Sequence, residues 1–313
     1  MGEQTHDITF PGAGVTLAGS LTVPDRDGPV PGVLLVGGSG PSDRHNDTHF
    51  PPIRAHLVAA GFAVLSYDKR GVGGSSGAWQ DGGLDDLAAD ALAAWEHLRA
   101  RPGVLAGATG LFGHSEGGWV VLRAATGRDD VPWLVVNGCP GMTPAEQDRY
   151  AFENFTRRAG GDVEAVLAVY DRVVEAARRG ADFAEATRLA TAPGVPPEFT
   201  ENWDDVDERL WGFLKRKQDH DPVPDIAGLR CPLLAVFGGA DELVPVVDSA
   251  RLFTAAATRP DRPRGATLAT AVFPGANHRV QVDGPDHLAP GYLDALTAWI
   301  RDRAESFHGG VPG

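Results

Sequence analysis

The sequence predicts an α/β fold with a mostly parallel, doubly wound sheet, an antiparallel hairpin at the N-terminus and an inserted helical segment. Short apolar runs of strand length alternate with helical patterns of ten or more residues. This alternation stops near Gly141 and resumes near Pro232. The 40 glycines and 24 prolines lie between the patterned segments rather than in tracts, which indicates many tight loops.

The expected elements follow in chain order. The opening hairpin pairs residues 8–10 with 15–23 around a Pro-Gly-Ala-Gly turn. The expected core strands are residues 32–36, 62–67, 109–112, 133–137, 232–237 and 267–273. The expected helices of the core are residues 52–60, 84–99, 116–126, 246–256 and 292–303.

Residues 142–221 interrupt this pattern with three helical patterns and no convincing strand. The clearest begins with Asp162 as N-cap and stops at Gly180, and another spans residues 205–217. We therefore predict an α/β core of residues 1–141 and 222–313 and a helical cap of residues 142–221 that borders the active site. The tail, residues 309–313, is expected to be disordered.

Composition excludes several classes of protein. The 313 residues are 42% hydrophobic and 22% charged, as in globular proteins. A net charge of −14 disfavours contact with nucleic acid or anionic lipid, so we expect neither as a partner. Cys139 and Cys231 lie in no CxxC pair, which excludes a disulfide scaffold or a thiolate zinc site. Without a signal peptide pattern or a membrane-length apolar run, a cytoplasmic location is expected.

The chemistry is indicated by the run Gly113-His114-Ser115-Glu116-Gly117, which follows a strand and opens a helix. In that context Gly-x-Ser-x-Gly predicts a nucleophile elbow, with Ser115 on a strained turn that only flanking glycines allow. The N-terminus of the new helix points free N–H groups at developing negative charge. The alternative is a Gly/Ser turn with a buried serine.

A serine hydroxyl needs a base to take its proton. Asp241 and His278 each follow one of the last two strands, so both lie at the sheet edge where Ser115 lies. We predict a catalytic triad in which Asp241 orients His278 and His278 activates Ser115. The alternatives are Glu242 or Asp248 as the acid and His287 as the base.

The predicted oxyanion hole uses backbone N–H groups. One comes from Glu116 and the other from the Gly37–Gly40 loop, where Ser39 is favoured over Gly38. No phosphate-binding glycine motif is present, so nucleotide binding is not expected. Because a carboxylate beside the oxyanion would oppose its charge, we expect Glu116 to turn away and pair with a cation. The candidate cations are Arg44, Lys69 and Arg70.

Two further patterns bear on ligands. His45 and His49 are four residues apart, but no third metal ligand accompanies them, so we predict no metal and no cofactor. The insertion is rich in aromatic side chains, which favours a substrate with a hydrophobic part. These side chains are Tyr150, Phe152, Phe155, Trp203, Trp211 and Phe213.

Together these motifs resemble the α/β-hydrolase superfamily, and within it bacterial carboxylesterases of the prolyl-oligopeptidase-like or lysophospholipase-like group. The matching segments are residues 38–44, 67–73, 113–118 and 239–245, with His278. The resemblance implies ester hydrolysis through an acyl-enzyme without a cofactor, with Ser115, Asp241 and His278 as the triad and Gly38 and Ser39 in the oxyanion loop. This chain has Gly37-Gly38 where the family usually has His-Gly, and the insertion matches no motif.

The sequence thus predicts a serine carboxylesterase that acts on a small-molecule acyl substrate. A thioesterase, acyltransferase, lactonase or peptidase would use the same triad. A different class, a non-catalytic ligand-binding protein of the same fold, is the second alternative. No oligomeric state is predicted.

Overall fold

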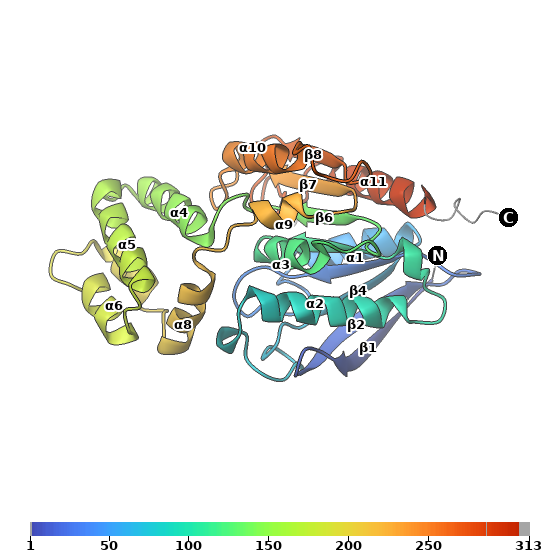
Figure 1. Cartoon of the computed structure of the whole chain (residues 1–313), viewed down its shortest axis with the longest axis horizontal. Coiled ribbons are helices and arrows are strands. Elements are labelled where there is room, and N and C mark those ends of the chain that lie inside the picture. Colours follow the sequence, from blue (N-terminus) through green and yellow to red (C-terminus); the bar gives the residue numbers. More distant parts are fainter. Residues whose placement is uncertain (1, 286, 307–313) are drawn as a thin grey trace.

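The structure is a computed structural model that describes residues 2–285 and 287–306. Eight strands form one sheet in the order β1-β2-β4-β3-β5-β6-β7-β8 (Figure 1). The strands are β1 (Glu3–Pro11), β2 (Thr16–Pro24), β3 (Gly32–Val36), β4 (Ala63–Tyr67), β5 (Gly110–His114), β6 (Leu134–Asn137), β7 (Leu233–Gly238) and β8 (Leu268–Phe273). Strands β1 and β2 pair antiparallel, as do β2 and β4, and the other neighbouring pairs are parallel. The predicted mostly parallel sheet with an N-terminal hairpin is confirmed.

Helices cover both faces of the sheet and enclose two hydrophobic cores. On one face lie α2 (Leu84–Arg99), α3 (Glu116–Ala125), α9 (Val223–Ala227) and α10 (Val246–Ala257). On the other lie α1 (Phe50–Ala59) and α11 (Tyr292–Ser306). Strands β3 to β7 are buried along their whole length, which explains why they appear in the sequence as continuous apolar runs.

The insertion folds into five helices that lie at one side of the sheet in Figure 1. They are α4 (Pro144–Ala159), α5 (Val163–Arg178), α6 (Phe183–Ala190), α7 (Pro197–Trp203) and α8 (Glu208–Lys217). Three helices were expected here. Helices α6 and α7 have only eight and seven residues, too few for a clear helical period. The five helices share a third hydrophobic core that includes Tyr170, Phe199, Trp203 and Trp211.

The insertion contacts the core through α4 and α8. Helix α8 packs on the short 3-10 helix η1 (Trp79–Asp81), where the rings of Phe213 and Trp79 meet edge to face at 5.0 Å. Helix α4 bonds to the loop that follows β7. A second 3-10 helix, η2 (Ala106–Ala108), lies before β5. The division of the chain into a core and a cap of residues 142–221 stays a proposal.

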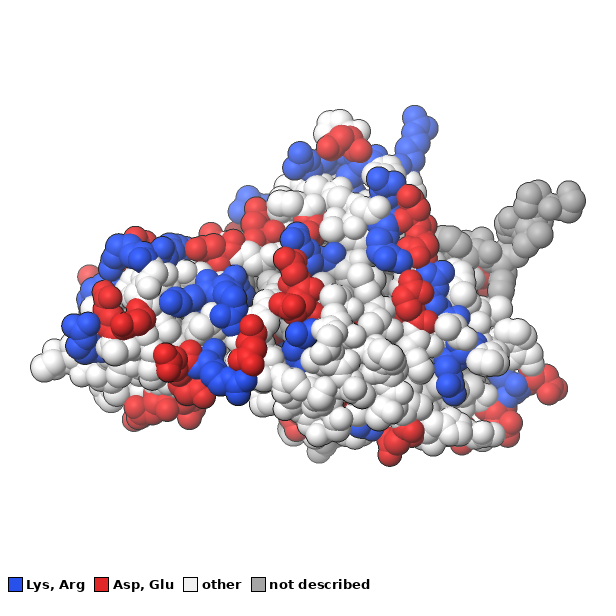
Figure 2. Space-filling view, turned by 60° about the horizontal axis from the view of Figure 1, so that its bottom comes forward, with Lys and Arg blue, Asp and Glu red and all other residues white. Residues whose placement is uncertain are grey.

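The surface in Figure 2 carries basic and acidic side chains side by side rather than one basic patch. Among the described residues, no helix combines the length and the apolar composition that crossing a membrane requires. The tail expected to be disordered lies outside the described residues.

Candidate active site

Ser115 lies at the sharp turn between β5 and α3. Its backbone φ of +55° is one that side chains of L-residues rarely adopt, so the turn holds strain. A Cβ on Gly113 would lie 2.2 Å from the carbonyl oxygen of Gly117. A Cβ on Gly117 would lie 2.4 Å from the carbonyl oxygen of Val36. Both positions therefore require glycine, which is the steric reason for the Gly-x-Ser-x-Gly spacing.

Asp241 and His278 form a direct pair. Asp241 Oδ2 lies 2.7 Å from His278 Nδ1. The other carboxylate oxygen, Oδ1, accepts hydrogen bonds from the backbone N–H groups of Leu243 at 2.8 Å and Val244 at 3.0 Å. The buried carboxylate is thus fixed from both sides. An imidazole whose Nδ1 donates to such a carboxylate presents Nε2 as a base.

The three residues follow β5, β7 and β8 at one edge of the sheet. The His278 ring packs at 5.0 Å from the ring of His114, the chain neighbour of Ser115. Ser115 Oγ makes no hydrogen bond to another residue in the described part of the chain. Nucleophile–base bonds are often long without substrate and tighten in the Michaelis complex. The arrangement therefore suits a serine nucleophile with a histidine base.

Among the described residues, the other sequence candidates for acid and base form no hydrogen bond or ion pair with the side chains of Ser115 or His278. Glu242 forms an ion pair with Arg158, and Asp248 lies 3.7 Å from Arg251 on the same helix. His287 is exposed. The contact with Asp241 thus distinguishes His278 from the alternative base.

The loop after β3 approaches the nucleophile closely, since a Cβ on Gly38 would lie 3.3 Å from Ser115 Cβ. The N–H of Gly38 donates to Asn46 Oδ1 at 3.2 Å and is therefore engaged. The N–H groups of Ser39 and Glu116 donate to no other group of the residues described. Of the two loop donors considered, the structure thus leaves Ser39 available and occupies Gly38.

Glu116 is buried and pairs with two lysines. Its Oε1 lies 2.9 Å from Lys69 Nζ and its Oε2 lies 2.7 Å from Lys217 Nζ. Burial alone would raise the pKa of Glu116, but the two ammonium groups outweigh it and lower that pKa to about 2. Lys69 was a predicted partner, whereas Lys217, from α8 of the insertion, was missed.

Lys69 also holds the loop after β3, because its Nζ donates to the carbonyl oxygen of Gly38 at 2.6 Å. Ser39 Oγ in turn donates to Glu116 Oε2 at 3.4 Å. Both proposed donors of the oxyanion hole are thus connected through one charge cluster. Glu116 turns into this cluster, as expected from the charge argument.

Arg44 and Arg70, the other two candidate partners, pair elsewhere. Arg44 Nη2 lies 2.8 Å from Asp68 Oδ2 and Arg70 Nε lies 2.6 Å from Asp90 Oδ2. The Arg44–Asp68 pair braces the loops after β3 and β4, because the backbone N–H of Arg44 also donates to Asp68 Oδ1 at 2.8 Å. The Arg70–Asp90 pair joins the loop after β4 to α2.

The imidazole rings of His49, His114 and His278 pack one against the next beside the Ser115 turn. His49 and His114 are buried with ring centroids 4.4 Å apart, and Asn46 Nδ2 lies 3.0 Å from His114 Nδ1. Burial lowers the pKa of His49 to about 3, so this ring is neutral at ordinary pH. The side chain of His45 is exposed, whereas that of His49 is buried. In residues 2–285 and 287–306, no three potential ligands gather as a metal site.

One face of α4 fastens the loop that carries Asp241. Gln147 Nε2 donates to the carbonyl oxygen of Leu243 at 2.9 Å, Tyr150 Oη to that of Asp241 at 3.2 Å, and Asn154 Nδ2 to that of Glu242 at 3.0 Å. Three consecutive carbonyl groups thus accept from one helix. No sequence pattern indicates this contact, because the donors face backbone atoms about 90 residues away.

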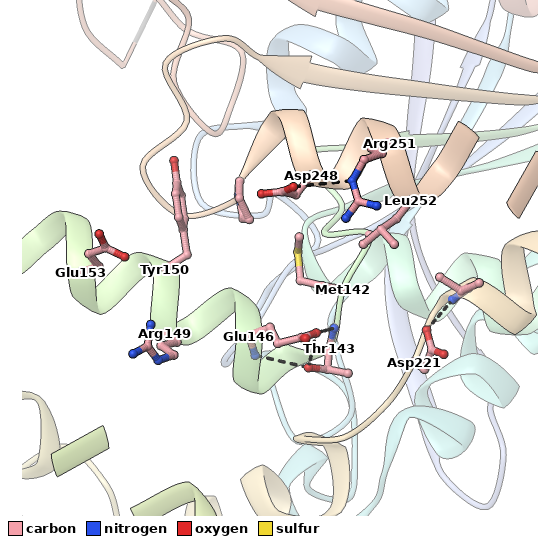
Figure 3. Close-up of a pocket in the computed structure, with 13 residues that line it drawn as sticks. Met142, Thr143, Glu146, Arg149, Tyr150, Glu153, Asp221, Asp248, Arg251 and Leu252 are labelled. Atoms are coloured by element: carbon pink, nitrogen blue, oxygen red, sulfur yellow. Dashed lines mark hydrogen bonds and ion pairs between the residues drawn. The ribbon is translucent and has the colours of Figure 1, made fainter. Parts of the chain in front are cut away.

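Two open hollows flank α4. One, of about 430 Å³, is lined by His278, Phe155 and Leu243 and lies directly at the candidate base. The other, of about 650 Å³, lies between α4 and α10 and is shown in Figure 3. Ser115, Asp241 and His278 do not line the second hollow, so its size does not make it the reaction site.

The fold and the elbow define a serine hydrolase of the α/β-hydrolase superfamily. The model of the X-Pro dipeptidyl-peptidase (S15) family matches residues 13–276, and the chain belongs to this family. The match includes Ser115 and Asp241 and ends two residues before His278.

Similar structures give the same fold at low sequence identity. DcsB, in complex with its substrate analogue, has a TM-score of 0.64 at 19% identity over 96% of this chain and 100% of DcsB. Est1E from Butyrivibrio proteoclasticus, bound to ferulic acid, has a TM-score of 0.60 at 17% identity, over 96% of this chain and 99% of Est1E. Proline iminopeptidase from Mycobacterium smegmatis has a TM-score of 0.61 at 17% identity, over 96% of this chain and 99% of the iminopeptidase. No curated protein sequence matches the chain significantly.

Proposed function

We propose that the protein hydrolyses carboxylic esters of small molecules through an acyl-enzyme on Ser115. The observation that carries this proposal is the hydrogen bond of 2.7 Å between Asp241 Oδ2 and His278 Nδ1. This pair lies at the same edge of the sheet as the strained turn at Ser115, which directly follows β5. Serine, imidazole and carboxylate in these roles constitute a catalytic triad.

In the proposed mechanism His278 Nε2 takes the proton of Ser115 Oγ while Oγ attacks the ester carbonyl. The N–H groups of Ser39 and Glu116 stabilise the oxyanion. His278 then gives its proton to the leaving alcohol, and the acyl-enzyme remains. Water attacks the acyl group with His278 again as base, which releases the acid and restores Ser115.

Peptide hydrolysis is the second candidate, because the chain belongs to a family described as X-Pro dipeptidyl-peptidases. The same triad cleaves amides when the leaving amine receives its proton from the histidine. The two candidates therefore differ in the substrate that the site admits and share the Ser115 chemistry.

The triad is tested with a fluorophosphonate probe on the wild type, Ser115→Ala and the control Ser76→Ala, whose serine is exposed. We expect covalent labelling of the wild type and the control and none of Ser115→Ala. Ester hydrolysis should fall by roughly three or more orders of magnitude in Ser115→Ala without loss of folding. Normal labelling or normal turnover of Ser115→Ala would contradict the assignment, and an unlabelled wild type would favour the non-catalytic alternative.

The substrate class is tested by comparing p-nitrophenyl esters with an X-Pro p-nitroanilide. We expect kcat/KM to be higher for the esters. A higher kcat/KM for the anilide would establish the peptidase and reject the esterase.

A further inference from the structure

The side-chain amide of Asn46 lies between the loop after β3 and the nucleophile elbow. Asn46 Oδ1 accepts hydrogen bonds from the N–H of Gly38 at 3.2 Å and from Ser42 Oγ at 3.0 Å. Asn46 Nδ2 lies 3.0 Å from Nδ1 of His114, which is part of the elbow. Both Asn46 and His114 are buried. One side chain thus connects the loop of the proposed oxyanion hole with the turn that carries the nucleophile.

The direction of the hydrogen bond to His114 follows from the other contacts of Asn46. Because Oδ1 accepts from two donors, the atom that faces His114 is the amide nitrogen, which can only donate. His114 Nδ1 therefore accepts, and the ring is neutral with its proton on Nε2. Burial lowers the pKa of His114 well below its ordinary value, which agrees with a neutral ring.

Gly38 is held at both of its backbone groups. Asn46 accepts from its N–H, and Lys69 Nζ donates to its carbonyl oxygen at 2.6 Å. That carbonyl and the N–H of Ser39 belong to one planar trans peptide, so they point in opposite directions. Since glycine has no side chain to restrict its backbone, both contacts are needed to hold this peptide. Together they set the direction of the Ser39 N–H, the proposed oxyanion donor.

The same contacts explain the glycine at position 37. A Cβ on Gly37 would overlap Ser42 Oγ and would lie 3.3 Å from Asn46 Oδ1. A side chain at this position would therefore displace the hydrogen-bonded pair of Ser42 and Asn46 from the loop. The loop is thus supported by Asn46, eight residues further along the chain than Gly38, and not by a side chain of residue 37.

We propose that Asn46 is a positioning residue of the oxyanion hole, whose amide holds the Gly38–Ser39 peptide in place against the turn that carries Ser115. The proposal rests on the proposed esterase function. An oxyanion donor acts only when its N–H points to the place where negative charge develops. Displacement of this peptide therefore weakens binding of the transition state more than binding of the substrate, so the loss of the amide should lower kcat and leave KM little changed.

The test compares the wild type with Asn46→Gly and with the matched control Asp47→Gly. Asn46 has a φ of +46° and Asp47 one of +59°, which glycine adopts without strain, so each change removes only a side chain. The Asp47 carboxylate is exposed and lies 2.8 Å from Arg279 Nη1, so it does not share the buried contacts of Asn46. The control thus has the same backbone conformation in the same turn.

Two probes separate the transition state from substrate binding. Turnover of p-nitrophenyl butyrate gives kcat and KM, and an aryl trifluoromethyl ketone serves as the inhibitor. Ser115 Oγ adds to the ketone carbonyl while its proton passes to His278, and the ketone oxygen becomes an oxyanion. The inhibition constant of the ketone therefore reports on the oxyanion hole.

His114→Phe is the second variant, and it decides the test if Asn46→Gly does not fold, as judged by circular dichroism. It keeps an aromatic ring between His49 and His278 and removes the Nδ1 acceptor of Asn46. Where both variants fold, the double variant should be no less active than Asn46→Gly, because the two changes break one contact. Losses that multiply, or a kcat of His114→Phe within about twofold of the wild type, would overturn the proposal.

For Asn46→Gly we expect kcat to fall roughly tenfold or more with KM within about threefold of the wild type, and the inhibition constant of the ketone to rise roughly tenfold or more. Asp47→Gly should stay within about threefold in all three quantities, because an exposed ion pair contributes little. An unchanged kcat in folded Asn46→Gly, or an equal loss in Asp47→Gly, would overturn the positioning role while leaving the esterase intact. An absence of ester hydrolysis by the wild type would instead reject the proposed function.

Discussion

The ammonium of Lys217 lies 2.7 Å from the carboxylate of Glu116, and this contact joins the last turn of α8 to the first turn of α3. Both side chains are buried, and Lys69 of the core is the second ammonium partner of Glu116. A buried charge that loses its partner costs far more than an exposed one. The contact therefore makes the placement of Glu116 depend on the inserted helices.

Lys217→Met leaves Glu116 with one ammonium partner. We expect the free energy of unfolding to fall by about 3 kcal/mol and kcat/KM for an ester to fall roughly tenfold, because the Glu116 backbone N–H is a proposed oxyanion donor. Urea unfolding and steady-state kinetics measure the two effects.

The matched control for that prediction is Lys215→Met on the same helix, whose ammonium donates to the carbonyl oxygen of Ala181 and lies over the ring of Trp211. Adding Glu116→Gln to Lys217→Met leaves the buried ammonium of Lys69 without its carboxylate partner and should lower the stability further. A double variant as unstable as Lys217→Met would show that charge pairing is not the cause.

A second prediction concerns the contact of α4 with the Asp241 loop. Tyr150→Phe removes the hydrogen bond to the Asp241 carbonyl oxygen, and Asn154→Ala removes the one to Glu242. Because this loop holds the carboxylate that orients His278, we expect each change to lower kcat roughly three- to tenfold with KM little changed. The stability cost should be about 1 kcal/mol each.

Arg149→Ala is the comparison for these variants, since Arg149 lies next to Tyr150 in sequence but pairs with Asp171 of α5. Its kcat should stay within twofold of the wild type. If KM rises instead and kcat is unchanged in Tyr150→Phe, the helix contributes to substrate binding rather than to positioning of the acid.

Much of the sheet and its edge could be predicted from sequence, because those features are local. Helix α2 spans residues 84–99 as expected, since its apolar residues repeat with the helical period. The turn at Ser115 is predicted by five adjacent residues, Gly113 to Gly117. Asp241 and His278 follow strand ends, and parallel strands bring their carboxyl ends to one edge.

The partners of Glu116 and of the Asp241 loop were harder to find, because they depend on how the insertion packs. Lys217 is 101 positions from Glu116, and no periodicity relates the two. Composition did hold one indication. The chain has three lysines, at positions 69, 215 and 217, among 28 basic residues. Two of the three meet on Glu116, where compact ammonium groups can approach one carboxylate together.

A third prediction tests the steric need for glycine at the elbow. In Gly117→Ala the new Cβ would lie 2.4 Å from the carbonyl oxygen of Val36 and 2.5 Å from that of Gly37. Backbone atoms on both sides must shift, so we expect a loss of at least about 3 kcal/mol of stability and of most activity. Gly107→Ala meets no atom within 4 Å and should change the unfolding free energy by less than about 0.5 kcal/mol. Equal stabilities of the two variants would contradict the proposed strain.

The last prediction concerns the buried imidazole of His49. Burial and the nearby positive charge of Arg279 lower the pKa of His49 to about 3, from an ordinary value of 6.5. Between these values the unfolded chain binds a proton that the folded protein does not. The stabilising effect of the neutral ring is therefore complete above pH 6.5 and is lost as the pH falls toward 3.

His49→Leu removes this titration while keeping an apolar side chain beside Phe50 and His114. Between pH 7.5 and pH 5.5 the wild type should lose about 1.4 kcal/mol more unfolding free energy than the variant, because the two proteins share all their other histidines. Urea unfolding at the two pH values measures the difference. His45→Leu, which changes an exposed histidine four residues earlier, should keep the wild-type loss. The same loss in His49→Leu as in the wild type would mean that His49 titrates normally in the folded protein.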